Sequence, residues 1–324
     1  MTDLTNNERP APLQVAWLFL ALAFAIPWLL LILGIREKWG EDYLIFGVAG
    51  PAIAAMILAR KSLSSTRGGI PRVIASLGVG LLGWIILLMS RQWRAGTIEP
   101  LRWNAWLILP ALMPALVCWG ALGAEGAKGQ WLRSLIVPTN WRWPIIAFFA
   151  WPAFLLIPAE LFHLAGGRLT MPAGAKLSGA YLATSAVMFA KELLFAGVLE
   201  EPGWRGFLLP RLEARYSPLL ASVLVWLPWA AWHAPLDFTS WLGHSLMSYV
   251  QIRVAYFLVI SILMTWLYNR SGRSLLTVVV FHAGFNTFPF VLPYAPPMLA
   301  LIFLCAIAAI ISDRMWKRID LRGA

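Results

Sequence analysis

The stretch AYLATSAVMFAKELLFAGVLEEPGWRG (residues 180–206) joins twenty mostly apolar residues to a polar cluster. Glu200 and Glu201 close the apolar run, and Arg205 follows four residues after Glu201. A charged side chain at the centre of a membrane helix costs roughly 2.5–3.5 kcal/mol on insertion scales, so such residues need a partner or a function. The stretch therefore predicts a membrane helix that carries a polar site.

The composition of the whole chain supports a membrane protein. Of its 324 residues, 60% are hydrophobic and 13% are charged, and the mean hydropathy is +0.71. Soluble domains usually have about 45–50% apolar and about 25% charged residues. The 19 Trp residues agree with this class, because indole rings favour the membrane–water interface. We expect an all-α fold, a polytopic bundle of eight to ten transmembrane helices.

Ten apolar segments are long enough to be candidate spans. The segment 73–90 has basic flanks on both sides, at Arg72 and Arg91, so it either spans the membrane or lies along its surface. The candidates are 13–34, 43–59, 73–90, 104–124, 145–165, 179–200, 217–234, 244–268, 274–292 and 295–312.

The cations indicate how the chain is oriented and what it contacts. The net charge is +11, but Lys and Arg are dispersed among short loops and form no single basic patch. This pattern favours anionic membrane lipids as partners and argues against nucleic acid. We expect a single membrane domain in three parts: helices of low motif content in 1–178, a catalytic helix core in 179–312, and a basic cytoplasmic tail in 313–324.

Polar residues recur on the helices that follow the two glutamates. His233 closes one apolar run, and His282 and Asn286 lie four residues apart on another. Residues at this spacing share one helix face, and buried polar groups in a membrane bundle turn toward one another. We expect a shared polar site. The adjacent Lys191 and Glu192, by contrast, are interpreted as a structural ion pair.

Two chemistries suit this set of side chains. Glu200 with His233 and His282 has the composition of a catalytic zinc site, although the local H-E-x-x-H pattern is absent. Alternatively, a partly dry carboxylate acts as general base on water, and a His and an Asn donate hydrogen bonds to the developing oxyanion. The spacing leaves both open.

Three short motifs resemble those of the CPBP family of intramembrane proteases, which includes the type II CAAX prenyl endopeptidases. EEPGWR (200–205) matches the pattern E-E-x-x-x-R, and HAGFN (282–286) matches H-x-x-x-N. WAAWH (229–233) resembles F-x-x-x-H, with Trp229 in place of Phe. The motifs stand in family order, and the resemblance covers about residues 180–295.

The resemblance implies a role for each matching residue. Glu200 corresponds to the general base that activates water, with His233 beside it. His282 and Asn286 correspond to the pair that stabilises the oxyanion. The resemblance leaves metal dependence open: we expect no cofactor, and in the zinc-dependent alternative the ligands would be Glu200, His233 and His282.

Four further residues receive supporting roles from the same resemblance. Glu201 and Arg205 correspond to an ion pair that orients the site. Trp204 and Trp229 are expected to line the substrate path. Independently of the resemblance, Pro202 and Pro210 are expected to break the helix after the glutamate pair.

The expected function is an intramembrane endopeptidase in a bacterial cell membrane, with its C-terminus in the cytoplasm. Its substrate would be a membrane-associated, lipidated or exported peptide. The alternatives are a zinc-dependent version of the same protease, a non-proteolytic scaffold or bacteriocin-immunity factor, and a transporter that relays protons. The lack of internal symmetry in the sequence disfavours the transporter.

Overall fold

A computed structural model describes residues 13–37, 45–59, 69–93, 97–100, 102–124, 126–172, 178–237, 245, 247 and 250–318. The described residues form helices and no β-strand, which confirms the all-α prediction. The first half contains α1 (Leu13–Arg36), α2 (Ile45–Val48), α3 (Gly50–Leu58), α5 (Gly69–Gln92), α6 (Ile108–Leu122), α7 (Gly126–Arg133) and α8 (Arg142–Leu164). The second half contains α9 (Gly179–Glu192), α10 (Val198–Glu201), α11 (Leu209–Glu213), α12 (Pro218–Trp232), α13 (Ala234–Asp237), α15 (Phe257–Arg270), α16 (Leu275–Val291) and α17 (Pro297–Ser312).

The lengths of these helices confirm a multi-pass membrane protein. Five helical stretches among the described residues are long and apolar enough to cross a bilayer, and four shorter apolar helices accompany them. Each of the ten predicted segments contains a helix. The segment expected to start at 73 is a 24-residue helix, Gly69–Gln92, with the length of a span.

The helix that carries the glutamate pair is longer than predicted. We expected it to end at Glu200 and to break at Pro202, but the helical stretch continues from Gly179 to Glu213 over 35 residues. Two π segments join its parts, at Leu193–Gly197 and at Pro202–Leu208. Pro202 is the first residue of the second π segment. Proline has no main-chain N–H, and the wider π winding lets the helix continue without that hydrogen bond. The glutamates therefore lie inside a helix and not at its end.

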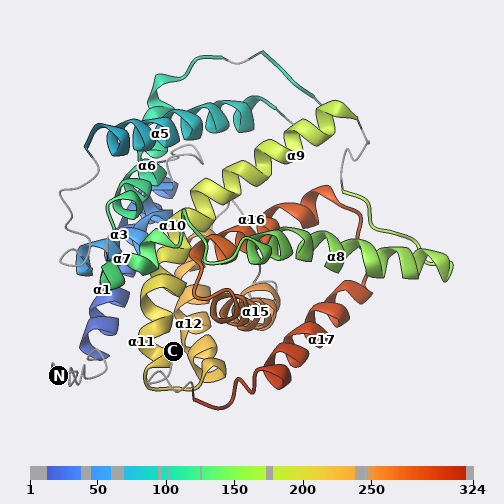
Figure 1. Cartoon of the computed structure of the whole chain (residues 1–324). Helices are drawn as coiled ribbons and strands as arrows, with labels where there is room; N and C mark the ends of the chain where they lie inside the picture. Colours follow the sequence, from blue (N-terminus) through green and yellow to red (C-terminus); the bar gives the residue numbers. More distant parts are fainter. Residues whose placement is uncertain are drawn as a thin grey trace.

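The motif helices pack around α16. Figure 1 shows α16 beside α8 and crossing close to α9, and these helices are in contact along their lengths. At Gly197 a Cβ atom would lie 2.9 Å from Cγ1 and 3.0 Å from the carbonyl oxygen of Val279, so only glycine permits this approach. The close packing brings the third motif, on α16, to the helix that carries the first, and the second motif's helix, α12, contacts the π segment Pro202–Leu208.

The N-terminal helices support the motif helices more than the sequence indicated. Helix α3 packs against α10 and the π segment after it. A Cβ at Gly203 would lie 2.5 Å from the Cβ and the carbonyl oxygen of Pro51, the second residue of α3. Trp204 packs edge-on against Phe19 of α1, with ring centroids 5.6 Å apart. The first half of the chain thus forms one wall of the motif region.

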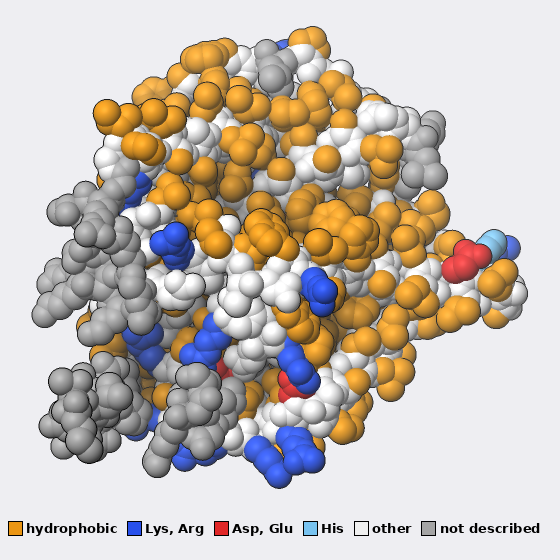
Figure 2. All heavy atoms as spheres, in the orientation of Figure 1, with side chains coloured by type: hydrophobic (Ala, Val, Ile, Leu, Met, Phe, Trp, Pro, Cys, Tyr) orange, Lys and Arg blue, Asp and Glu red, His pale blue; other side chains and the backbone are white. Residues whose placement is uncertain are grey.

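The surface agrees with insertion in a lipid bilayer. Figure 2 shows hydrophobic side chains over most of one face, with Lys and Arg side chains gathered on its lower and left parts. Ile70, Trp103 and Leu164 each expose more than 70% of their surface, which suits contact with lipid. The C-terminal cations Arg314, Lys317 and Arg318 are also exposed. A cytoplasmic C-terminus stays a prediction.

Candidate active site

The charged residues of the first motif are buried in the bundle. Glu200 exposes 4% of its surface, and Glu201 and Arg205 expose none. His233 and His282 expose 8% and 2%. Buried charges are costly unless they are paired and hydrogen-bonded, so the contacts among these side chains determine what the site can do.

Glu201 is the centre of an ion-paired network. Its Oε1 accepts hydrogen bonds from Arg205 Nη1 at 3.1 Å and from His282 Nδ1 at 2.7 Å. Arg205 also donates from Nη2 to Ser261 Oγ at 3.4 Å. The predicted pair of Glu201 and Arg205 is therefore present, and it extends to His282. These contacts fix the orientation of the imidazole ring of His282.

Glu200 has a different environment from its neighbour. Its Oε2 accepts a hydrogen bond from Trp229 Nε1 at 2.8 Å. The guanidinium of Arg205 lies over the same indole ring, 4.3 Å from the ring centroid. The ring of Phe257 stacks on the indole, with ring centroids 4.6 Å apart. Trp229 is completely buried, so it holds the carboxylate of Glu200 instead of lining an open substrate path. A Phe at this position, as in the family pattern, has no N–H to donate.

His233 contacts both the main chain and the ring of Trp229. Its Nδ1 is 2.7 Å from the main-chain oxygen of Trp229, and its ring packs edge-on against Phe257, with centroids 5.5 Å apart. Among the described contacts His233 and Glu200 share no direct hydrogen bond, and both bind Trp229. The Nδ1 contact indicates that Nδ1 carries the hydrogen, which leaves Nε2 as the acceptor in the neutral ring.

Asn286 has a partner that the sequence analysis missed. Its Nδ2 donates to Glu192 Oε2 at 3.0 Å. The expected ion pair between Lys191 and Glu192 is wrong, because no salt bridge within the described part of the chain includes Lys191. Residues adjacent in a helix do not face each other, which explains why the two side chains separate. Glu192 belongs to the polar site.

The first π segment explains how Glu192 and Glu201 both reach α16. Nine residues separate them, which is about 2.5 turns of a regular α-helix and would place them on opposite faces. The π segment Leu193–Gly197 lies between them, and a π turn contains one residue more than an α turn. With one residue absorbed, the separation becomes about 2.2 turns, and both carboxylates can face His282 and Asn286.

Trp204 lies outside this network. It is fully buried and packs against Trp232, with ring centroids 6.4 Å apart, as well as against α1. Its Nε1 has no hydrogen-bond partner in the structure. Trp204 thus packs between α1 and Trp232, and its place in the substrate path stays a prediction.

The predicted zinc ligands do not assemble as a metal site. Among the described residues, no three His, Cys, Asp or Glu side chains lie close enough together to hold a metal ion. In particular, His233 directs Nδ1 to the main-chain oxygen of Trp229, and Glu200 accepts a hydrogen bond from the indole of the same residue. The arrangement of Glu200, His233 and His282 therefore does not fit a zinc site, and no catalytic step is assigned to a metal.

Comparison with known proteins supports the motif assignment. Residues 180–288 match the profile of the family described as type II CAAX prenyl endopeptidase Rce1-like. This segment is similar to the Rce1-like domain. The matched region runs from the second residue of α9 to within three residues of the end of α16, so it holds every motif residue discussed above. The resemblance inferred from the three motifs is confirmed.

A curated relative extends the similarity beyond the Rce1-like domain. The chain is 29% identical over 192 residues to a protein of Methanococcus maripaludis named CAAX prenyl protease 2. The alignment covers 56% of this chain and 70% of the relative. Both findings support a membrane endopeptidase, and the buried network of the Rce1-like domain is its candidate active site.

Proposed function

We propose that the chain hydrolyses peptide bonds within the membrane by a glutamate-activated water. Glu200 takes a proton from water, and the resulting hydroxide oxygen attacks the carbonyl carbon of the scissile bond. The proton then passes to the leaving nitrogen as the C–N bond breaks. The products are a carboxylic acid and an amine, so the atoms balance with water as the only co-reactant.

The contrast between the two glutamates supports Glu200 as the base. Glu201 accepts hydrogen bonds from two side chains, Arg205 and His282, which fix it inside the ion-paired network. Glu200 accepts one side-chain hydrogen bond among the described contacts, at Oε2 from a neutral indole, so its Oε1 is left for a water molecule. This difference between neighbouring carboxylates is the observation that carries the proposal.

His282 and Asn286 are suited to stabilise the oxyanion. Because the Nδ1 of His282 contacts Glu201, a proton on its Nε2 would make a cationic donor that Glu201 balances. Asn286 uses one amide hydrogen on Glu192 and keeps a second, since the amide nitrogen carries two. His233 completes the wall of the site and, through Nε2, offers an acceptor that positions the water.

The proposed substrate is a membrane-associated or lipidated peptide. The site is buried within apolar helices, so a substrate must reach it from the bilayer or along a path through the bundle. The name of the archaeal relative refers to a prenyl protease, which makes prenylated peptides the first class to test. A scaffold or immunity factor would keep the same fold without turnover, and the experiment below separates these cases.

The test compares the wild type with Glu200→Gln in detergent or liposomes. The probe is a fluorescent farnesyl-cysteine peptide that continues three apolar residues beyond the cysteine, the CAAX arrangement. We expect the wild type to cleave it and Glu200→Gln to lose about 10²–10⁴-fold in rate, the typical contribution of a general base. An unchanged melting temperature of the variant would show that the fold is kept. Equal cleavage by both proteins would refute the role of Glu200.

A further inference from the structure

Two cavities meet at the indole of Trp266, in the part of the bundle formed by α8, α15 and α17. Figure 1 shows α17 below α8 with α15 between them, and α17 contacts both of these helices. One cavity, of about 340 Å³, is an apolar groove whose lining includes Ile146, Phe154 and Leu263. The other, of about 300 Å³, is a basic pocket whose lining includes Arg314, Lys317 and Arg318. Because Trp266 lines both, the groove and the basic pocket are neighbours.

Small side chains on one face of α17 line the apolar groove. Cys305, Ala308, Ala309 and Ser312 follow the spacing i, i+3, i+4 and i+7, so they share one helix face over about 10 Å. The next residue, Asp313, lines the basic pocket. One end of the groove therefore lies at the basic pocket, and the two cavities together have an apolar part and a cationic part.

The basic pocket carries positive charge that the described residues do not neutralise. Asp313 accepts hydrogen bonds from Arg270 at 2.6 Å and 2.5 Å, so its negative charge is already balanced. The side chains of Arg314 and Lys317 are exposed, and within the described part of the chain neither has a hydrogen bond or an ion pair. These two neighbouring cations can therefore bind one anionic group.

The turn that carries the two cations is held in place by the main chain. Met315 N donates to the oxygen of Ile310 at 3.0 Å. Arg314 N donates to the oxygen of Ile311 at 3.2 Å, which completes a Schellman motif at the end of α17. Met315 also accepts a hydrogen bond from Leu219 N of α12 at 2.9 Å. Arg314 has a φ of 47° at the position where glycine is usual, and such a strained residue points to a role for its side chain.

We propose that the apolar groove and the basic pocket together bind an anionic phospholipid. Arg314 and Lys317 hold the phosphate, whose charged oxygens suit two cations, and one acyl chain lies in the groove against α17. Basic pockets between membrane helices bind anionic lipid headgroups in this way. A zwitterionic lipid brings a further cation beside these two and binds less well. The site is independent of the proposed function, because it requires no peptide cleavage.

The test measures lipid binding to the full chain in detergent by native mass spectrometry. The probes are dioleoylphosphatidylglycerol and dioleoylphosphatidylcholine, and the wild type should prefer the first. Each cation near an anionic headgroup contributes about fivefold in affinity, so the double variant Arg314→Gly, Lys317→Gln should bind phosphatidylglycerol roughly 25-fold more weakly. It should also lose the preference between the two lipids. Ala308→Phe, which fills the groove from an exposed position, should weaken the binding of both.

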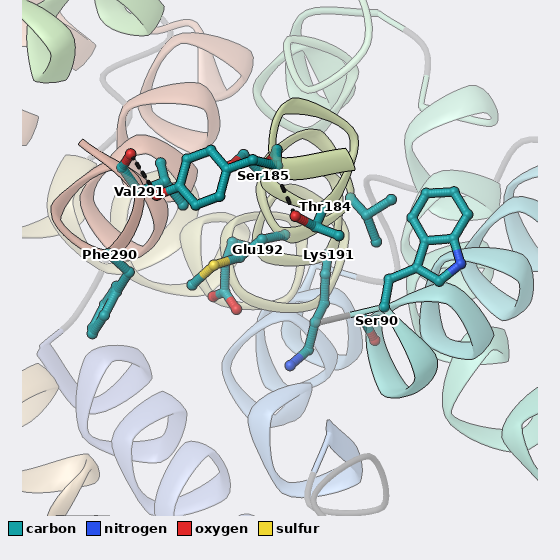
Figure 3. Close-up of a pocket in the computed structure, with 11 residues that line it drawn as sticks. Ser90, Thr184, Ser185, Lys191, Glu192, Phe290 and Val291 are labelled. Carbon is teal, nitrogen blue, oxygen red and sulfur yellow. Dashed lines mark hydrogen bonds between the residues drawn. The ribbon is translucent and has the colours of Figure 1, made fainter. Parts of the chain in front are cut away.

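Arg314→Gly separates a binding role from a purely structural one. Glycine adopts the left-handed conformation without strain, so this variant should keep or raise the melting temperature in lipid-free detergent while its lipid affinity falls. Phosphatidylglycerol should raise the melting temperature of the wild type and not that of the double variant. Lys191→Gln is the control, because Lys191 lies in a different pocket, between α5, α9 and α16 (Figure 3). It should bind phosphatidylglycerol as the wild type does.

Three results would overturn the proposal. The first is equal affinity of the wild type and the double variant for phosphatidylglycerol. The second is displacement of phosphatidylglycerol by an equal concentration of glycerol 3-phosphate, which would assign the basic pocket to a free anion. The third is displacement by the farnesyl-cysteine peptide, with peptide binding that falls in Ala308→Phe and in the double variant. That pattern would assign both cavities to a lipidated peptide.

Discussion

Replacing Arg205 by Met tests whether the polar network is a buried ion-paired unit. Arg205 exposes none of its surface, binds Glu201 at 3.1 Å and lies over the ring of Trp229. Met fills similar apolar volume but leaves the carboxylate of Glu201 without its guanidinium partner. Removing one member of a buried pair usually destabilises by about 3–5 kcal/mol, because the other charge stays buried and uncompensated.

Arg270→Met is the matched control for this substitution. Arg270 also pairs with a carboxylate, Asp313, but the two side chains expose 50% and 20% of their surface. An exposed ion pair contributes about 0–1 kcal/mol. The same chemical change is thus made in a buried and in an exposed pair. Thermal unfolding of both variants in the same detergent compares them directly.

The expected result is a clear difference between the two variants. At about 2.1 cal/mol/K per residue, the 324 residues have an unfolding entropy of about 0.7 kcal/mol/K, so a loss of 1 kcal/mol lowers the melting temperature by about 1.5 °C. Arg205→Met should therefore lower it by about 4–7 °C. Arg270→Met should change it by about 1.5 °C or less. The double variant Arg205→Met, Glu201→Gln should lose less stability than the sum of the losses in the two single variants. In the double variant neither charged partner is left buried without the other. Equal melting temperatures of Arg205→Met and Arg270→Met would refute the buried pair.

Three other predictions concern the metal, the indole and the glycine contact. Activity on the farnesyl-cysteine peptide should survive exhaustive chelation, and stoichiometric zinc whose removal and return control turnover would contradict this. Trp229→Phe should lower kcat by roughly 10–100-fold, because Glu200 loses its hydrogen bond, and a wild-type kcat would show that the bond is not needed. Gly203→Ala should lower the melting temperature, since its Cβ would lie 2.5 Å from Pro51, whereas Gly78→Ala, with open space around it, should not.

The sequence predicted the class of fold and the members of the site for a simple physical reason. Membrane spans are long apolar runs, and polar residues inside them stand out because the bilayer offers them no water. Glu200, Glu201 and Arg205 were recognised in this way, and so were His282 and Asn286. The structure places all five at the contact of α10 with α16 or beside it. Their catalytic roles stay predictions.

The sequence did not predict the partner of Asn286, because the reasoning assumed a regular helix. With 3.6 residues per turn, Glu192 faces away from Glu201, and pairing it with the adjacent Lys191 was the simplest assignment. The π segment at Leu193–Gly197 changes the phase of the helix between them. Apolar periodicity does not reveal such a segment, since all five of its residues are apolar or glycine.

The treatment of Trp229 shows a second way in which a pattern can mislead. As a replacement for Phe in F-x-x-x-H, Trp229 exchanges one aromatic ring for another. In the structure the rings are not equivalent, because the indole N–H is the side-chain donor to Glu200. A chain with Phe at this position must hold its catalytic carboxylate by another donor or leave it freer to move. The geometry of Glu200 in this chain therefore depends on the one motif position where it departs from the family pattern, and that position is where its catalytic properties should differ from those of its relatives.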